Sequence, residues 1–191
     1  MDVEKGPVLL FLRHTVCLGV FALLFSLMFS GLEGLNAQSL PIKGSLKKNG
    51  ENFQEAEILL YERNQVVGKT EPNLLGKFTF ELSLNSHYTV EVRSEGHITK
   101  RVSFDTHIPE KINEVDPSTF GFDVVMLEKR GIPEDEAGVF DFPVGRVFFD
   151  PYEEEFRFND SYTARIRREF RKVLNKKGRE VEATEKLRSK K

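Results

Sequence analysis

Three histidines follow residue 37, and their imidazoles are the side chains best suited to acid–base or metal chemistry. His87 falls on the outward side of a predicted strand, His97 follows a turn glycine, and His107 lies in a predicted loop. A metal site would require three loops to converge on one ion, and the spacing does not demand this. The sequence therefore predicts no metal site and no cofactor.

Motifs typical of common catalytic sites are missing from the sequence. It has no Gly-x-x-x-x-Gly-Lys phosphate loop, no Gly-x-Ser-x-Gly elbow and no His-Glu-x-x-His zinc helix. The single cysteine, Cys17, excludes an intrachain disulfide and a cysteine-ligated cluster. We expect no catalytic residues and no enzyme. A hydrolase whose Ser, His and Asp residues meet only in the fold is a remote alternative.

Charge divides the chain into an acidic body and a basic end. Residues 165–191 contain 12 Lys or Arg and 4 Asp or Glu, a net charge of +8. Residues 38–164 contain 14 Lys or Arg and 23 Asp or Glu, a net charge of -9. The total of -2 hides this asymmetry, which favours an anionic partner at the basic end.

An apolar stripe in the same region predicts an amphipathic helix. Tyr162, Ile166, Phe170 and Leu174 recur every four residues. The stripe either packs on the rest of the protein, leaving the cations in solvent, or lies in an interface with lipid head groups or an envelope polymer. In the second case a basic face would bind the partner, formed by Arg165, Arg167, Arg168, Arg171 and Lys172.

A glycan is the alternative ligand. Sugar-binding surfaces usually present exposed aromatic faces, and this chain has no Trp. Most of its 17 Phe fall on the inward side of predicted strands. Tyr61 is the strand tyrosine whose position predicts exposure, so it is the candidate sugar contact.

Alternation with a period of two governs the stretch between Leu40 and about Lys129. Along residues 77–84, for example, Phe78, Phe80 and Leu82 share one face. About seven such strands are separated by turns every 8–12 residues, which is typical of an antiparallel sandwich whose two sheets bury their apolar faces together. No intervening helical pattern supports a parallel βαβ sheet.

The region 130–160 predicts an acidic connector. Residues 145–149 and 155–158 could form an edge hairpin with Asp150-Pro151 as its turn. The period becomes helical after Asp160, the predicted N-cap, and Gly178 predicts the end of the helix. Residues 161–191 are thus a basic helix with a charged tail.

Several segments together resemble the carboxypeptidase regulatory-like domain, a transthyretin-like seven-stranded sandwich. The pattern Gly-x-Phe-x-Phe-x-Leu occurs at residues 76–82, Tyr-x-Val-x-Val at 88–92, and His97 follows Gly96 where the family has Gly-Tyr. The segment 142–151 resembles exported envelope proteins of Gram-negative bacteria that carry such a sandwich. The resemblance implies an accessory or attachment module.

Export is also predicted from the first residues. Residues 15–32 carry no charge, Lys5 and Arg13 precede them, and small or polar residues follow up to Ala37. This arrangement predicts a signal peptide over residues 1–37, cleaved after Ala37, with an uncleaved N-terminal anchor as the alternative. We expect location in the periplasm, outer membrane or cell surface of a Gram-negative bacterium.

Together these patterns predict an all-β protein. A seven-stranded antiparallel transthyretin-like sandwich over residues 38–129 is followed by a short β extension and a C-terminal amphipathic α-helix. The expected function is non-catalytic adhesion, scaffolding or protein interaction in the envelope, with carbohydrate binding as the alternative. The expected partner is an envelope protein, an anionic surface or a glycan, and membrane contact is expected only through the N-terminal segment or the basic helix. Nucleic acid is excluded because export separates the chain from it.

Overall fold

The computed structural model describes residues 38–112, 118–129, 132 and 138–188, with side chains of the last helix described as far as Lys176. The chain divides after Ala37 into two units, and the second contains all of the described residues. The predicted export segment, residues 1–37, and the acidic run 134–136 lie outside the described residues.

One sheet of the described region has four strands, with the long strand β1 Ser39–Lys48 at its centre. It pairs antiparallel with β2 Glu51–Asn52 and with β5 Lys77–Ser83. It pairs parallel with β8 Phe120–Val125. This sheet therefore mixes both kinds of pairing.

The second sheet has six strands in the order β10-β9-β7-β6-β3-β4 within the described region. Their bounds are β3 Glu57–Glu62, β4 Gln65–Thr70, β6 His87–Arg93, β7 Lys100–Asp105, β9 Gly145–Asp150 and β10 Glu155–Phe158. The predicted β extension is present as the antiparallel β9–β10 hairpin at one edge of this sheet.

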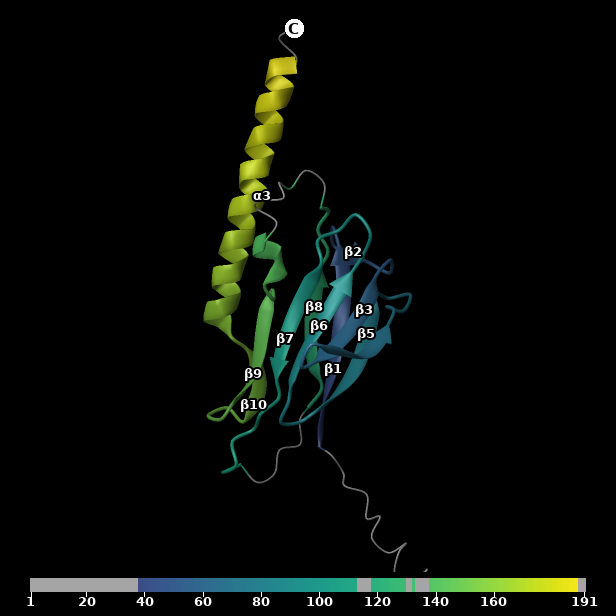
Figure 1. Ribbon diagram of the computed structural model, residues 1–191, viewed down its shortest axis with the longest axis vertical. Helices are drawn as coiled ribbons and strands as arrows, with labels where there is room; N and C mark the ends of the chain where they lie inside the picture. Colours follow the sequence, from purple (N-terminus) through teal and green to yellow (C-terminus); the bar gives the residue numbers. More distant parts are fainter. Residues whose placement is uncertain (1–37, 113–117, 130–131, 133–137, 189–191) are drawn as a thin grey trace, which may run out of the picture. The chain divides into compact units, whose positions relative to one another are not determined.

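Alternating side chains form the core between the two sheets, which lie face to face (Figure 1). Along β1, Leu40, Ile42 and Leu46 are buried, and the residues between them are more exposed. The same alternation buries Val102 and Phe104 of β7. Each large apolar side chain buried in this way contributes about 1.5–3 kcal/mol. The predicted all-β sandwich with a C-terminal helix is confirmed.

Two pairings differ from the antiparallel arrangement that the sequence predicted. β1 pairs parallel with β8, and β7 pairs parallel with β9. The chain leaves the second sheet after β7, joins the first sheet as β8 beside β1, and returns to the second sheet as β9. A strand of the other sheet therefore lies between β7 and β9 in the sequence, and these two pair in the same direction.

A glycine shapes the turn between β4 and β5. Gly76 has a φ of +70°, and a Cβ there would lie 2.7 Å from the carbonyl oxygen of Leu46. The side chain of Asn73 accepts hydrogen bonds from the backbone N–H groups of Leu75 and Lys77, at 2.9 and 3.0 Å. Only glycine satisfies both the positive φ and the close backbone approach. This explains the glycine that opens the Gly-x-Phe-x-Phe-x-Leu pattern.

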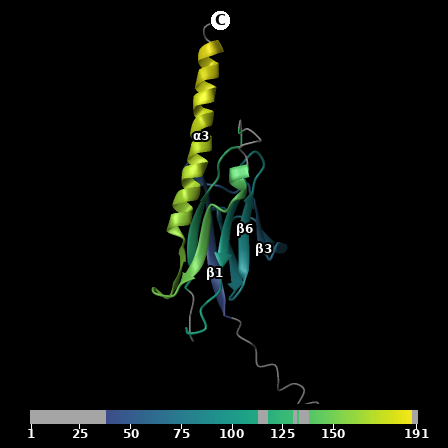
Figure 2. The ribbon, with the colours of Figure 1, turned by 60° about the vertical axis from the view of Figure 1, so that its left-hand side comes forward.

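The helix α3, Asp160–Arg188, lies alongside β9, and its C-terminal part extends past the strands (Figures 1 and 2). The N-cap is Asn159 and not Asp160, because the Asn159 side chain accepts the backbone N–H of Tyr162 at 3.0 Å. The predicted end at Gly178 is wrong. One glycine costs a helix only about 1 kcal/mol, and the residues after it are mostly good helix formers.

No helix within the described residues combines the length and the apolar character needed to cross a bilayer.

Candidate functional site

A groove of about 350 Å³ lies between α3 and the side of the sandwich where β7 and β8 face each other. We call it the helix groove. Its polar lining consists of Lys100, Asp123, Arg167 and Arg171. Its apolar walls come from both sheets and from the helix, and include Val102, Val124, Leu127, Ile166, Phe170 and Leu174.

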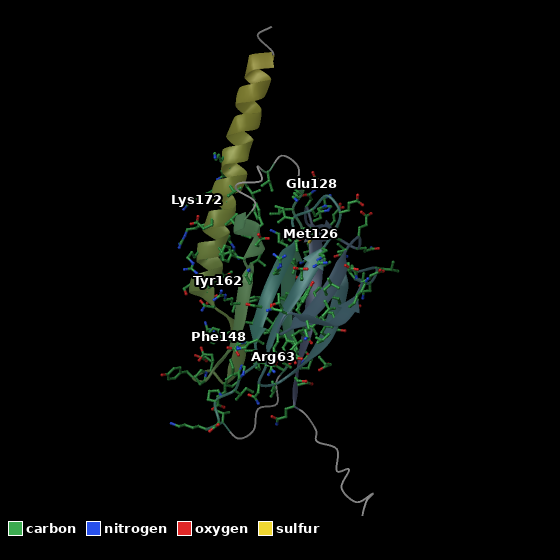
Figure 3. All side chains as sticks on the ribbon, viewed as in Figure 1. Arg63, Met126, Glu128, Phe148, Tyr162 and Lys172 are labelled. Carbon is green, nitrogen blue, oxygen red and sulfur yellow. The ribbon has the colours of Figure 1, made fainter. Side chains whose placement is uncertain are left out.

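The apolar stripe of α3 holds the helix in place. Tyr162, Ile166 and Phe170 are buried together with Ile98 and Phe140 in a cluster separate from the main core. The Tyr162 hydroxyl donates a hydrogen bond to the carbonyl of Pro143, at 2.9 Å. Figure 3 shows Tyr162 near the start of the helix and Lys172 farther along it. Of the two alternatives for the apolar stripe, these residues therefore follow the one in which the helix packs on the rest of the protein.

Lys100, the first residue of β7, is the unusual group in the helix groove. The residue is 3% exposed, and its Nζ lies 4.6 Å from the ring centre of Phe170 and 5.8 Å from that of Phe140. Within the described residues its ammonium forms no hydrogen bond or ion pair. Burial lowers the pKa of Lys100 to about 8, because an apolar environment disfavours the charged form.

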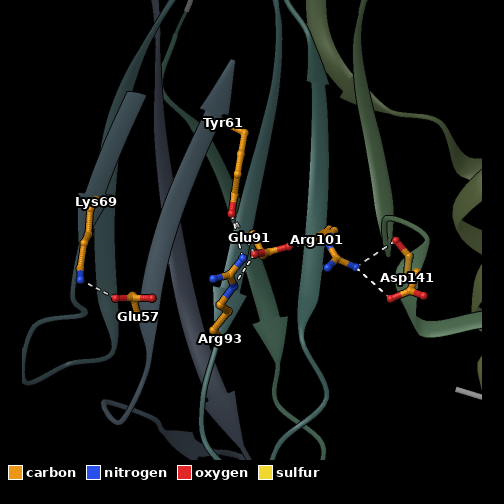
Figure 4. Close-up of polar contacts among 7 residues, drawn as sticks. All are labelled: Glu57, Tyr61, Lys69, Glu91, Arg93, Arg101 and Asp141. Carbon is orange, nitrogen blue, oxygen red and sulfur yellow. Dashed lines mark hydrogen bonds and ion pairs between the residues drawn. The ribbon is translucent and has the colours of Figure 1, made fainter. Parts of the chain in front are cut away.

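The short helix η1, Gly138–Asp141, covers one side of this lysine. Phe140 packs against Phe170, with ring centres 4.7 Å apart. Arg101 holds η1 to the sheet by donating to the carbonyl and the carboxylate of Asp141, at 3.1 and 3.4 Å (Figure 4). The two aromatic rings next to Lys100 are thus fixed from two different elements.

The charges of the helix groove are predominantly positive. Arg167 and Arg171 line it from the helix, and Lys100 lines it from the sheet. The acidic lining residue, Asp123, is paired with Lys47 at 2.8 Å. An apolar cavity with three cations and one carboxylate that is already paired suits a ligand with an apolar body and an anionic head.

The predicted basic face divides in the structure. Arg167, Arg168 and Arg171 are all exposed, and of these Arg167 and Arg171 line the helix groove. The guanidinium of Arg165 lies 5.5 Å from the ring centre of Tyr162. Lys172 forms an ion pair with Glu169 at 2.9 Å. Two of the five predicted residues therefore meet at one cavity, and their role in binding stays a prediction.

Lys100 was not among the predicted site residues, although the sequence contains a signal for it. It stands on the same strand parity as Ile98, Val102 and Phe104, all of which are buried. A lysine on an apolar parity predicts either an edge position or a buried charge. To decide between an edge position and a buried charge, one must know where α3 packs, and the strand pattern does not give this information.

Tyr61, the predicted sugar contact, lies on the outer face of the six-stranded sheet and is half-buried. Its hydroxyl accepts a hydrogen bond from Arg93 at 2.8 Å (Figure 4). Arg93 and Arg101 also flank the buried carboxylate of Glu91. Tyr61 lines a polar hollow of about 410 Å³ that also includes Arg63. Its contact with a sugar stays a prediction.

Metal-ligating side chains come together at the other end of β7. His87, Asp105 and His107 present ligand atoms that all lie within 4.8 Å of one another. His87 and Asp105 also line the polar hollow. The group is thus separated from Lys100 by the length of β7.

No family model and no curated protein matches the chain. Solved structures match over about half of it. A 3-chlorocatechol 1,2-dioxygenase from Rhodococcus opacus 1CP is 8% identical, covers 50% of this chain and 62% of its own, and has a TM-score of 0.37. The chain therefore spans about three fifths of that enzyme.

Two further matches are of different kinds. The C-terminal fragment of the pilus adhesin SpaC from Lactobacillus rhamnosus GG is 11% identical, with 51% of this chain and 48% of its own covered, at a TM-score of 0.35. The protein S.CueP is 12% identical, with 45% and 61% covered, at a TM-score of 0.32. At these low values the matches assign no family, so the carboxypeptidase regulatory-like resemblance is unconfirmed.

The prediction that the chain is not an enzyme requires correction. Catechol 1,2-dioxygenases recur among the structural matches, and another match is a dioxygenase domain from Streptomyces. The prediction rested on the absence of familiar catalytic motifs from the sequence. The recurrence of enzymes among the matches overturns the prediction, and it assigns no activity to this chain.

Proposed function

We propose that the chain is an exported β-sandwich interaction module that binds an anionic amphiphile in the helix groove. The ligand class is a molecule with an apolar body and one carboxylate or phosphate head. The observation that carries the proposal is Lys100, a buried lysine whose ammonium lines an apolar cavity without a counter-ion among the described residues.

A buried charge without a partner costs several kcal/mol in a protein. Phe140 and Phe170 offset part of this cost through their ring faces, and an anion would offset more. In the low-dielectric groove, a carboxylate beside Lys100 would interact more strongly than at the exposed surface. A bound head group would therefore complete an interaction that the protein leaves open.

The size and walls of the helix groove suit the other half of such a ligand. A volume of about 350 Å³ falls at the lower end of the range for small-molecule sites. Burial of an acyl or aromatic body against Val124, Ile166 and Leu174 would contribute about 25 cal/mol for each Å² removed from water. Arg167 and Arg171 would attract the anion as it approaches.

The proposed cellular setting rests on the sequence. The uncharged stretch 15–32 and the resemblance to carboxypeptidase regulatory-like envelope proteins favour export to a Gram-negative envelope. Anionic amphiphiles are abundant there as lipids. The groove thus supports an anionic surface as the partner, in preference to a glycan at Tyr61.

Dodecanoate is a suitable probe because it combines twelve carbons with one carboxylate. We expect calorimetry to show one dodecanoate bound per chain at concentrations below micelle formation. Dodecyltrimethylammonium, which has the same tail and the opposite charge, should bind at least about tenfold more weakly. Equal binding of the two would show that only the apolar walls matter, and would contradict the proposal.

Two lysine variants separate the groove from general charge effects. Lys100→Met should weaken dodecanoate binding by at least about tenfold. Lys43→Met, which changes the net charge equally at an exposed position of β1, should leave it unchanged. Undiminished binding by Lys100→Met would refute the proposed role of Lys100.

A further inference from the structure

The register of the second sheet places two potential metal ligands side by side. His87 of β6 is the direct cross-strand partner of Asp105 of β7, so both side chains project from the same face. His87 Nδ1 lies 3.6 Å from Asp105 Oδ1. His107 follows two residues after Asp105, and its Nδ1 lies 2.6 Å from the same oxygen.

The two imidazoles also lie close to each other. Their ring centres are 4.8 Å apart, with the planes tilted by 47°. The backbone N–H of His107 donates a hydrogen bond to Asp105 Oδ1 at 3.2 Å, and this bond holds the loop against the end of β7. Two imidazoles and one carboxylate thus surround one point from a strand, a strand end and a loop.

Thr106 fixes the backbone that carries these ligands. It is completely buried, and its hydroxyl lies 2.9 Å from the carbonyl oxygens of Ser83 and Ser86. The same hydroxyl accepts the N–H of Ser86 at 2.9 Å, and the Thr106 N–H donates to the Ser86 carbonyl at 2.9 Å. The residue before His87 is therefore tied to the residue between Asp105 and His107. Such support is what a preorganised ligand set needs.

We propose that His87, Asp105 and His107 bind a divalent transition-metal ion such as zinc. Imidazole and carboxylate ligands suit zinc, nickel and copper ions. Zinc bonds of about 2 Å in tetrahedral geometry place ligand atoms roughly 3.3 Å apart. In the structure the ligand atoms lie within 4.8 Å of one another, which is close to the spacing that zinc requires. The exposed side chains can rotate to reach that spacing.

Remaining coordination positions of the ion would face outward. The side chains of His87, Asp105 and His107 are 66%, 46% and 51% exposed. His87 and Asp105 border the polar hollow, where water or another ligand could complete the coordination. The site is independent of Lys100 and of the proposed amphiphile.

Zinc chloride titrated into the tag-free chain tests the proposal by calorimetry. We expect one equivalent to bind at micromolar protein concentration. His87→Gln, His107→Gln and Asp105→Asn should each lower the zinc affinity by at least about tenfold. Glu51→Gln, which alters an exposed strand carboxylate in neither proposed site, should leave the affinity within about twofold.

Cobalt absorption and circular dichroism complete the experiment. Cobalt bound through the same ligands should give visible bands that disappear in His87→Gln. Because the three side chains are exposed, the variants should retain the wild-type dichroism spectrum. The proposal is overturned if the wild-type chain fails to bind one equivalent of zinc. It is also overturned if folded ligand variants bind zinc as tightly as Glu51→Gln.

Discussion

Replacing Lys100 with methionine should stabilise the protein. Methionine is unbranched and of similar length, so it can fill the same space between Phe140 and Phe170 without a charge. Most core substitutions destabilise, which makes an increase in the free energy of unfolding a distinctive outcome.

The expected size follows from the burial of the ammonium. Lowering the pKa of Lys100 from its ordinary value of 10.5 to about 8 corresponds to about 3 kcal/mol of destabilisation while the lysine is charged. Cation–π contacts with the two aromatic rings offset about 1–2 kcal/mol of this cost, and the Lys100→Met variant lacks these contacts. The net gain at pH 7 should therefore be about 1–2 kcal/mol.

The gain should depend on pH in a defined direction. Below about pH 8, Lys100 is charged in both the folded and the unfolded chain, so the penalty is fully present. Between about pH 8 and 10.5 the unfolded chain binds more protons than the folded one, so wild-type stability rises relative to the variant. The advantage of Lys100→Met should shrink across this interval.

Urea unfolding of both proteins at pH 7 and at pH 10.5 measures this difference. Other titrating groups are common to both proteins and cancel in the comparison. Lys43→Met serves as the control and should change stability by less than about 0.5 kcal/mol. A Lys100→Met variant less stable than wild type at pH 7, or a difference that does not change with pH, would refute the reasoning.

Three further changes probe other parts of the account. Gly76→Ala should destabilise the protein by about 1–3 kcal/mol in urea unfolding, because it combines a positive φ with a close backbone oxygen; an unchanged midpoint would contradict this. Asn159→Ala should cost about 1 kcal/mol by removing the N-cap of α3, and Asn159→Asp should retain most of it in the same assay. Reversing Arg167 and Arg171 to glutamate should leave the dichroism spectrum intact and weaken dodecanoate binding at least tenfold; unfolding would show that these exposed arginines are structural.

The alternation of side chains was sufficient to predict the sandwich. Residues such as Val90 and Phe104 are buried as their parity requires, because each sheet has one dry face. The parallel pairing of β7 with β9 was not predictable in this way. Parity determines which face a residue occupies, and says nothing about which strand lies beside it.

The candidate sites were harder to predict from the sequence, because parity does not give the neighbours of a residue. The sequence places Lys100 on the apolar side of its strand, but the surroundings of the lysine depend on where α3 and η1 pack. His87 and His107 are far apart in the chain and meet through the register of β6 and β7. Arg167 and Arg171 were predicted as cations of a helix face, and only tertiary packing assigns them to a cavity.

The pKa of Lys100, measured by NMR with and without dodecanoate, tests the central claim most directly. Chains with carbon-13 in the lysine side chains would report the titration of each amine. The account predicts that dodecanoate raises the pKa of Lys100 from about 8, because a bound carboxylate favours the charged amine. An identical Lys100 titration in the presence of saturating dodecanoate would contradict the claim.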